Sequence, residues 1–430
     1  MEIIKRAVVA VPILVFLFST SVKAELADSG TGARAVAMGQ AQTAVANDAS
    51  AVNYNPAALV YAREYWEVTG RHLFFQIGKS GYQPYLRLNG IDQEYPYASY
   101  TTLGAVIPLG KRITIGVDFQ YCDDWVLYTL LASGPRFNRY TPTQQVGGKY
   151  GFALKITDKF SVGYSSLTNF HFNFSTISLD LNAVLAGLGL PLGEPIVNMN
   201  PYMEVDVLPA SSYQVGALYR PFKWLHLGVN YNYKNPSYTI IPVYLPAGLL
   251  PETHLTITTN SERPTMLTFG IGVFPNDKIT LAFDLSYDMW SRTKNYWKFE
   301  ADSSLFSFDN SIVEPDDVWV PRVGVEYRDK MKGKLSRASY AIRGGYLFYK
   351  SPYPEATGAN NDIDNDAHNI SFGLSLGYSP KKHFSYIGVE YFWEYMGMVE
   401  RTHADISRSP AVIVSDGYVI YNGFTLSVKL

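Results

Sequence analysis

The sequence contains very little cysteine and comparatively little charge. Cys122 is the single cysteine in 430 residues, so no disulfide can form within the chain and no cysteine-based metal site can exist. Lys, Arg, Asp and Glu together make up 17% of the residues, below the roughly 25% of a typical soluble domain. The net charge of −2 gives no reason to expect nucleic acid as a partner.

Long apolar runs are missing as well. Residues 7–18 form an apolar stretch that is too short to cross a bilayer as a helix. Lys5 and Arg6 precede it and the small-residue sequence VKA at 22–24 follows it, which is the pattern of a secretory signal peptide. We therefore expect residues 1–24 to be a signal peptide. Beyond them no apolar run reaches about 18 residues, which excludes membrane-spanning helices.

Aromatic residues and alternating segments are abundant instead. Aromatics make up 15% of the chain, and Tyr alone contributes 33 residues. Apolar and polar residues alternate with a period of two in segments such as 279–290 and 370–379. The polar faces are rich in Gly, Ser and Asn, whereas the solvent face of a soluble β-sandwich is richer in Lys and Glu. In an exported chain this pattern is typical of an outer-membrane β-barrel of a Gram-negative bacterium.

Turn residues divide the chain into fourteen expected strands, an even number that suits a closed barrel. These strands are 65–79, 94–109, 111–126, 146–157, 159–174, 202–220, 223–238, 254–274, 278–299, 316–328, 338–351, 367–380, 383–397 and 414–429. Short turns alternate with long connections, which are 80–93, 127–145, 175–201, 239–253, 300–315, 352–366 and 398–413. Short periplasmic turns and long outer loops are typical of outer-membrane barrels. The sequence thus predicts an all-β transmembrane barrel over residues 65–430.

Residues 25–64 remain between the signal peptide and the barrel. They are rich in Gly and Ala and include NDASAVNYNPAAL at 47–59, which shows no strand alternation. A barrel of fourteen strands encloses a lumen wide enough to leak unless it is filled, so we expect 25–64 to fold as a plug inside it. The sequence Asn55-Pro56-Ala57 predicts a turn, because Pro fixes its own φ and holds the preceding residue extended.

This segment resembles the hatch of the FadL-type outer-membrane transporters, which carry long-chain fatty acids and other hydrophobic compounds. The resemblance begins with residues 32–35 and 47–50 and continues with Asn55, Pro56 and Ala57, which are similar to the Asn-Pro-Ala motif of that hatch. Further stretches resemble the family in order: RPTMLTFGIGVFPNDKITLAFDLSYDMWS at 263–291, VPRVGVEYR at 320–328, RGGYLFYKSPYPE at 343–355 and IDNDAHNISFGLSLGY at 363–378.

The resemblance implies a function. A member of this family catches a hydrophobic ligand outside the cell, admits it to the lumen above the hatch and releases it sideways through the wall into the bilayer. It needs no cofactor and no energy source. The N-terminus of the hatch, near residues 25–28 here, would gate the channel by a conformational change. We expect a monomer whose partners are the ligand and outer-membrane lipid.

Two of the long connections, 175–201 and 239–253, are unusually apolar for exposed loops. In the family the third and fourth outer loops form the groove that first catches the ligand, and these segments are the third and fourth long connections here. The expected groove residues are Leu181, Val184, Leu185, Leu188, Val243, Tyr244, Leu245, Leu249 and Leu250. An exposed apolar patch of this kind marks a binding site. The alternative is that these residues pack on one another and on the barrel rim.

The third expected strand is disturbed near its outer end. Asp123 and Asp124 follow a cleanly alternating stretch, and two consecutive Asp residues cannot both face the lumen without a bulge. In the family the lateral opening comes from a kink in the third strand. We therefore expect Asp123 and Asp124 to mark this opening, with the alternative that they begin the outer loop.

Several charged residues should face the lumen. They are Asp118, Asp284, Asp288, Arg322, Glu326, Arg343, Glu390 and Glu394. We expect them to form a ladder of ion pairs that also holds the plug through Arg34 or Asp48. The alternative is that Arg322 or Arg343 binds a fatty-acid carboxylate, which requires a partly desolvated cation.

Catalytic motifs are missing from the sequence. It contains neither an H-E-x-x-H metal motif nor a G-x-S-x-G nucleophile elbow. His171, His226 and His254 are expected to be structural, and we expect neither catalysis nor a bound metal. Two other functions stay open at this point: a hatch-containing barrel that shuttles or anchors secreted proteins, and an outer-membrane enzyme. The apolar connections favour transport, because a ligand-catching groove needs them and a protein shuttle does not.

Overall fold

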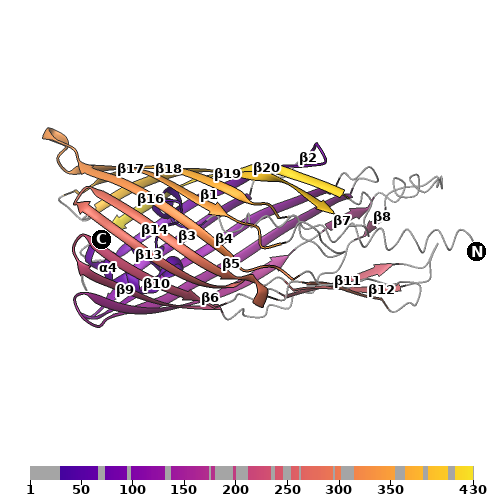
Figure 1. Cartoon of the computed structure of the whole chain (residues 1–430), viewed down its shortest axis with the longest axis horizontal. Helices are drawn as coiled ribbons and strands as arrows, with labels where there is room; N and C mark the ends of the chain where they lie inside the picture. Colours follow the sequence, from indigo (N-terminus) through magenta and orange to yellow (C-terminus); the bar gives the residue numbers. More distant parts are fainter. Residues whose placement is uncertain are drawn as a thin grey trace, which may run out of the picture.

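The computed structural model describes residues 30–65, 73–93, 98–130, 137–173, 176–179, 197–199, 212–233, 238–245, 253–260, 263–293, 296–301, 314–353, 364–380, 386–404 and 412–429. In that part of the chain, fourteen strands form the wall of a barrel (Figure 1). They are β1 (Phe74–Leu88), β3 (Ala98–Leu109), β4 (Ile113–Leu130), β5 (Phe137–Lys155), β6 (Phe160–Asn173), β9 (Ser212–Phe222), β10 (Leu225–Asn232), β13 (Thr265–Asn276), β14 (Ile279–Met289), β16 (Val318–Lys330), β17 (Ala338–Tyr349), β18 (Ala367–Tyr378), β19 (Tyr386–Ala404) and β20 (Val412–Lys429).

The wall is closed, because its first and last strands meet. Strand β1 pairs with β20 over residues 74–88 and with β3 over residues 74–82, antiparallel in both cases. Closure satisfies the backbone groups that an open sheet edge would leave unpaired, which is what a sheet in lipid requires. Three short strands extend the same sheet: β2 (Ile91–Gln93), β7 (Thr176–Leu179) and β8 (Val197–Met199). The predicted barrel of fourteen strands is confirmed.

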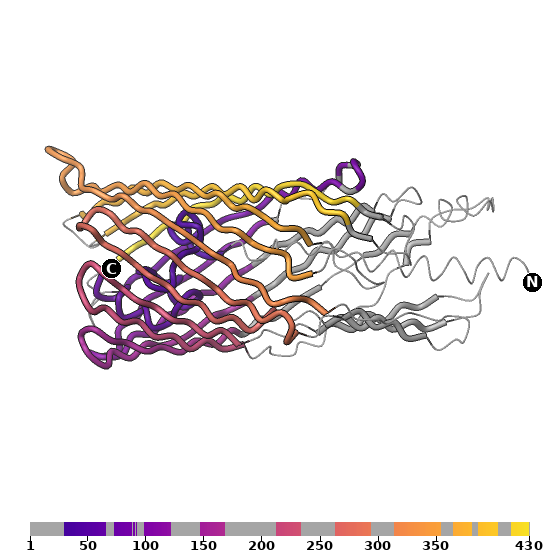
Figure 2. Tube along the Cα trace, viewed as in Figure 1, coloured from indigo at the N-terminus to yellow at the C-terminus, as the bar shows by residue number. Residues whose placement is uncertain are grey.

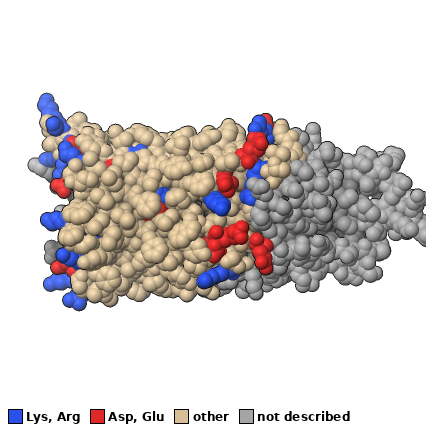
Figure 3. Space-filling model, viewed as in Figure 1, with Lys and Arg blue, Asp and Glu red and all other residues tan. Residues whose placement is uncertain are grey.

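The faces of the wall are inverted relative to a soluble protein. Along β18 the polar side chains of Asn369 and Ser371 are buried, at 2% and 4% exposure, whereas Ile370 and Leu376 are 56% and 61% exposed. The barrel exterior is correspondingly almost free of charge over its middle part (Figure 3). An apolar outer band around a polar interior identifies a barrel built for a bilayer and excludes the β-sandwich. Among the described helices, none is long and apolar enough to cross a membrane.

Some strand bounds differ from those expected. The expected strand 254–274 is two strands of different sheets, β12 (Thr253–Asn260) and β13, with Pro264 between them. Proline cannot donate a ladder hydrogen bond, so a strand readily ends there. The expected strand 278–299 is likewise interrupted by the 3₁₀ turn η2 (Trp290–Arg292), after which β15 (Tyr296–Ala301) begins.

Several expected loops are strands. Connection 239–253 contains most of β11 (Tyr238–Leu245), which pairs with β12, and β12 pairs with β15 in a separate three-stranded sheet. Connection 80–93 contains the outer half of β1, and connection 127–145 contains the ends of β4 and β5. These segments are rich in β-branched and aromatic residues, which favour strands wherever a partner strand lies alongside.

The plug is a chain of short helices inside the lumen. It contains α2 (Ala33–Ala37), α3 (Ala51–Tyr54), the 3₁₀ turn η1 (Pro56–Ala58) and α4 (Leu59–Tyr65). Figure 2 shows it as the indigo segment coiled within the barrel, towards the end with the short turns. Ala35, Val36, Ala37 and Met38 have no exposed surface. Residues 1–29 and 66–72 lie outside the described residues, so the signal peptide stays a prediction. Tyr65, the expected first residue of the barrel, is the last residue of α4, and the first wall strand begins at Phe74.

A belt of glycines on the inner wall lets the plug pack this closely. Its members are Gly104, Gly116, Gly163, Gly216, Gly228, Gly270, Gly272, Gly324, Gly345 and Gly373, and a Cβ at any of them would approach a plug atom to about 3 Å or less. They come from nine different wall strands. We call them the glycine belt. Glycine is the one residue that permits such close approach of two backbones, which explains why the polar face of so many strands carries it.

We predict that Gly345→Val will displace the plug, because its Cβ would overlap the backbone of Met38 and Gly39. The expected cost is about 1–3 kcal/mol of overpacking, together with a raised ion conductance in planar bilayers. Gly344→Val is the matched control, since the nearest atom to its Cβ is 3.8 Å away. Equal conductance and equal denaturant midpoints for the two variants would contradict this account of the belt.

Candidate functional site

The plug is bound to the wall by polar side chains that point into the lumen. Asp284 of β14 accepts hydrogen bonds from the backbone N–H groups of Gln42 and Thr43, at 2.8 and 2.9 Å. Gln76 of β1 accepts one from Ala49 at 2.9 Å, and Ser371 of β18 accepts one from Gly39 at 3.1 Å. Short helices leave many backbone donors unsatisfied, and the wall supplies acceptors for them from opposite sides of the barrel.

Asn55 fastens the middle of the plug. Its side-chain nitrogen donates to the carbonyl of Thr43 at 2.7 Å and to the carbonyl of Ala217 on β9 at 3.1 Å. Its side-chain oxygen accepts from the N–H of Ala57 at 3.1 Å and so caps the 3₁₀ turn that Pro56 begins. Asn55 itself is extended, which the following proline favours. The motif Asn55-Pro56-Ala57 therefore shapes the plug and ties it to the wall at once.

A buried series of alternating charges crosses from the plug to three wall strands. Glu326 of β16 lies 3.1 Å from Arg34 of the plug and 2.6 Å from Arg343 of β17. Arg343 in turn lies 2.9 Å from Glu390 of β19. We call these four residues the charge ladder. Arg34 also donates to the carbonyl of Val45, at 3.1 Å.

Of the eight lumenal charges expected to form ion pairs, Glu326, Arg343 and Glu390 do so in the charge ladder, and the plug enters it through Arg34. Asp118 and Asp284 instead accept hydrogen bonds from the plug. Asp48, the other plug residue considered for joining the ladder, accepts a hydrogen bond from the backbone of Ser50 at 2.8 Å. Arg343 lies between two carboxylates and is only 4% exposed. Its charge is already balanced, so the geometry favours a structural role over the binding of a ligand carboxylate.

A second ion-pair group holds the other end of the plug. Glu64 of α4 lies 2.6 Å from Arg220 of β9 and 3.0 Å from Lys155 of β5. Burial alone raises the pKa of Glu64, but the hydrogen bonds from Arg220 and Lys155 lower it below its ordinary value of 4.5. Because the pKa of Glu64 is lower in the folded state, its ion pairs stabilise the attached plug fully above pH 4.5. This stabilisation is lost as the pH falls through the folded-state pKa.

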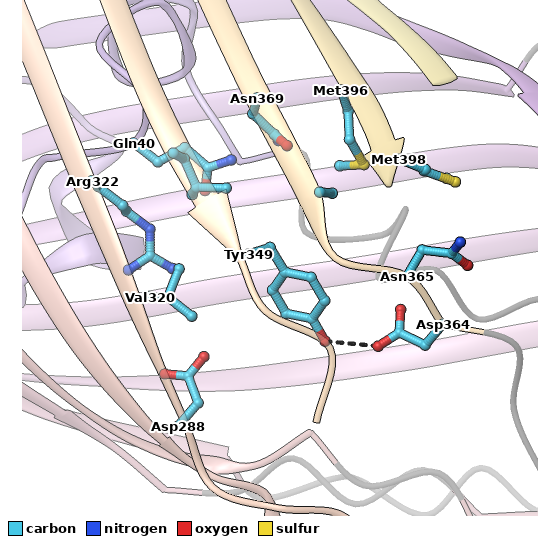
Figure 4. Close-up of a pocket in the computed structure, with 12 residues that line it drawn as sticks. Gln40, Asp288, Val320, Arg322, Tyr349, Asp364, Asn365, Asn369, Met396 and Met398 are labelled. Carbon is cyan, nitrogen blue, oxygen red and sulfur yellow. Dashed lines mark hydrogen bonds between the residues drawn. The ribbon is translucent and has the colours of Figure 1, made fainter. Parts of the chain in front are cut away.

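A pocket lies beside the plug, on the inner face of β14 and β16–β19. The cavity itself has a volume of about 40 Å³ and is open on one side, so a ligand as large as those of usual small-molecule sites, about 300–1,000 Å³, would extend beyond it into the lumen. Gln40 of the plug forms part of its lining. The wall contributes apolar and polar lining residues: Val320, Leu347, Tyr349, Ala367, Met396, Met398, Asp288, Arg322, Asp364, Asn365 and Asn369 (Figure 4).

The pocket has an apolar part and a few polar groups. Val320, Leu347, Tyr349 and Ala367 belong to one buried hydrophobic cluster, against which Met396 packs. The Tyr349 hydroxyl donates to Asp364 at 3.2 Å (Figure 4). Methionine suits a surface that accepts ligands of varied shape, because its side chain is flexible and polarisable. The lining thus combines an apolar side with an equal number of polar and charged residues.

Arg322 differs from the other charged residues of the lumen. It is half-buried and lines the pocket, and no hydrogen bond or ion pair joins it to another residue that the structure describes. Its backbone lies opposite Asp284 on β14, but the carboxylate of Asp284 is directed at the plug. Arg322 is thus a cation in a lining that also contains Asp288 and Asp364, and its charge acts on Asp284 across the strand pair without a direct hydrogen bond to it.

The other residues expected at the site are placed only in part. Leu181, Val184, Leu185, Leu188, Leu249 and Leu250 lie outside the described residues. Val243, Tyr244 and Leu245 are in β11, on a strand instead of a loop. The pairing of β4 with β5 advances residue by residue through Asp123 and Asp124, and the pairing with β3 is regular as far as Asp123, so these pairings have no bulge. The apolar groove and the opening at the third wall strand stay predictions.

Sequence reasoning missed most of the pocket. Gln40, Leu347, Ala367, Met396 and Met398 carry no motif, and they come from the plug and from three different strands. Alternation does predict which residues of each strand face inward. It does not predict which levels of the barrel the plug fills and which level it leaves open, because that depends on the fit of the plug.

Comparison with known structures supports this description. A Pseudomonas aeruginosa FadL homologue superposes with a TM-score of 0.63 at 17% identity, covering 93% of this chain and 97% of that one. The P. putida toluene transporter TodX gives 0.63 at 15% identity, with 94% and 99% covered. The monoaromatic hydrocarbon channel CymD gives 0.58 at 16% identity, with 92% and 97% covered.

The chain has the FadL-type fold. Its likeness to these structures extends over nearly the whole of each chain, so the fold includes the N-terminal plug as well as the wall. Neither a scan of protein-family profiles nor a search of curated proteins finds a match. At this level of identity the likeness establishes the architecture. The roles of individual residues must come from the geometry of this chain.

We predict that Arg34→Met will loosen the plug. Removing one partner of a buried charge group leaves Glu326 less compensated, which costs about 3–5 kcal/mol. Protease cleavage within residues 30–65 of the refolded protein in detergent should therefore accelerate, while the wall keeps its heat-modifiable migration. Arg87→Met is the matched control, because Arg87 pairs with Asp416 at an exposed position. Unchanged cleavage in Arg34→Met would show that Arg34 does not hold the plug.

Proposed function

We propose that this protein is an outer-membrane channel for the passive uptake of hydrophobic small molecules. The observation that carries the proposal is the pocket, apolar on one side, that lies against a plug filling the lumen. A ligand in this pocket is already inside the wall, yet the buried plug blocks the direct way through the barrel. The exterior of the wall is apolar, so the bilayer is the nearest solvent that would favour such a ligand.

The ligand is proposed to leave the lumen sideways. Lateral exit suits hydrophobic molecules, because it spares them a crossing of water between the two membranes. Asp123 and Asp124 on the third wall strand are proposed to mark this exit. Upstream, the apolar residues at 181–188 and 243–250 are proposed to form the outer groove that first catches the ligand. A wall closed by strand pairing all round must part locally, at an end of a strand, to release it.

The ligand class is proposed from the pocket and from the structural neighbours. TodX is a toluene transporter and CymD a monoaromatic hydrocarbon channel, which supports hydrophobic hydrocarbons as ligands of this fold. The pocket here adds Arg322, whose guanidinium suits a carboxylate. We therefore propose that the channel accepts hydrophobic molecules in general and holds long-chain carboxylates more tightly than neutral hydrocarbons.

We predict that filling the pocket will stop uptake. Ala367 is buried and lines the pocket, so Ala367→Trp should occupy the space and reduce uptake at least about tenfold if the pocket lies on the route. Ile370→Trp on the same strand is the matched control, because Ile370 is 56% exposed on the outer face and its replacement should leave uptake unchanged.

The measurement is growth on oleate, and uptake of labelled oleate and labelled toluene, in a host that lacks its own outer-membrane fatty-acid transporter. Heat-modifiable migration shows that each variant has folded. A folded wild type that takes up neither compound would overturn the proposed function and would favour a barrel that carries proteins. Normal uptake by Ala367→Trp would place the route elsewhere in the lumen.

Replacing Arg322 separates the two ligand classes. Arg322→Met removes the cation but keeps an apolar side chain of similar length. Oleate binding should weaken by about tenfold, because about one charge-assisted hydrogen bond is lost. Toluene uptake should stay constant, because toluene has no charged group. Binding is measured with the purified barrel in detergent by tryptophan fluorescence, and Arg322→Lys should retain part of the affinity. An equal loss for both compounds would show that Arg322 shapes the pocket and does not recognise a carboxylate.

A further inference from the structure

The turn between β16 and β17 is the most basic exposed segment that the structure describes. Residues 331–337 read MKGKLSR and contain the 3₁₀ turn η3 (Gly333–Leu335). We call residues 331–337 the basic turn. Lys332, Lys334 and Arg337 are all exposed, and Leu335 between them is 58% exposed. Such a combination of free cations and a bare leucine is unusual for a tight turn, which needs neither for its own geometry.

The cations of the basic turn are not neutralised within the part of the chain described. No ion pair or side-chain hydrogen bond joins Lys332, Lys334 or Arg337 to any other described residue. The adjacent Lys278 is different, because it lies 2.7 Å from Asp329. Three unpaired positive charges and one exposed leucine therefore remain available for a partner.

The basic turn leans away from the barrel. In Figures 1 and 2 it is the orange projection at the upper left, standing clear of the wall at the end where the short turns lie. Lys and Arg gather along this whole end of the molecule, and the same projection carries them at its tip (Figure 3). In an outer-membrane barrel the short-turn end faces the periplasm, so the basic turn lies beside the inner leaflet.

Two other short turns have a similar character, whereas the turns that contain Asp158 and Asp277 carry an exposed acidic residue. Lys111 and Arg112 follow Leu109, and Lys223 lies in the sequence between Phe222 and Trp224, whose rings stack on each other. Leu109, Phe222 and Trp224 are 50–56% exposed. Both of these turns, like the basic turn, place a positive group next to an apolar one, and the three turns lie at separate points of the wall. A partner that meets all of them must surround the barrel, as a lipid leaflet does and a single globular protein does not.

We propose that the basic turn is an interfacial anchor that binds anionic phospholipid headgroups of the inner leaflet. Leu335 would insert between the headgroups while Lys332, Lys334 and Arg337 remain at phosphate level, with their stems against the acyl boundary. Clustered Lys and Arg beside a membrane attract anionic lipids. The occupant chosen is phosphatidylglycerol, and its effect is to fix the depth and tilt of the barrel. This proposal requires only that the barrel spans a membrane and is independent of what the channel transports.

The test uses brominated lipids as local quenchers. A fluorophore is attached at Ser336→Cys in a Cys122→Ser background, and the full barrel is reconstituted in phosphatidylethanolamine bilayers that contain a small fraction of brominated lipid. Brominated phosphatidylglycerol should quench the fluorophore about fivefold more than brominated phosphatidylethanolamine at the same mole fraction. The ratio should fall towards one in about 0.5 M salt, because salt screens exposed charges.

Two sets of variants decide whether charge is responsible. The set Lys332→Gln, Lys334→Gln and Arg337→Gln should abolish the preference. The charge-conserving set Lys332→Arg, Lys334→Arg and Arg337→Lys should keep it. Equal quenching by both lipids in the unmodified turn, or a preference that survives neutralisation, would overturn the proposal. A preference that appears only when a periplasmic extract is present would also overturn it, in favour of an acidic protein partner.

Discussion

The attachment of Arg34 to Glu326 is the interaction on which the rest of the structure depends. Glu326 faces the lumen of a barrel whose exterior is apolar, and it has no exposed surface. A carboxylate in that position must be paired or pay the full cost of desolvation. One of its two close partners comes from the wall and the other from the plug. A third cation, Arg328 of the wall, lies farther away at 3.7 Å. Arg34 therefore adds a close partner from the plug to the cations that the wall supplies, and it joins the plug directly to a buried carboxylate of the wall.

The glycine belt allows the plug, which Arg34 joins to the wall, to pack closely against the wall. Backbone can approach backbone where Gly228 meets Thr43 and where Gly324 meets Met38, so the plug contacts the wall on all sides and not through a few long side chains. Movement of the whole plug would break these contacts together with the hydrogen bonds to Asp284 and Gln76. Opening a passage beside the plug therefore costs less free energy than moving the plug out of the way. The pocket next to Gln40 lies where such a passage would begin.

The ends of the barrel differ because their surroundings differ. Three of the short turns carry positive groups next to exposed apolar residues, whereas the outer parts of the wall strands continue beyond the apolar band, as β1 does in its pairing with β20 up to Leu88. The basic short turns suit contact with the surface of a lipid leaflet. The extended outer ends of the strands suit a structure that projects above the bilayer. The proposed transport would place demands on both ends, since it requires capture at the outer end and release into lipid.

The alternation of side chains in the sequence determined the wall, because a period of two is a local property that survives in any context where strands pair. The alternation was sufficient to predict the number of strands and the inward direction of Glu326 and Arg343. It also identified the plug as the segment without alternation. It failed at Pro264 and at Trp290, where a regular pattern continues across a real break and the following strand belongs to another sheet. Only the tertiary structure decided which cation pairs with which carboxylate, why Arg343 and not Arg322 belongs to the charge ladder, and where the plug leaves a pocket. These outcomes bring together residues as far apart in the sequence as Gln40 and Met398, which line one pocket, and no local pattern encodes that.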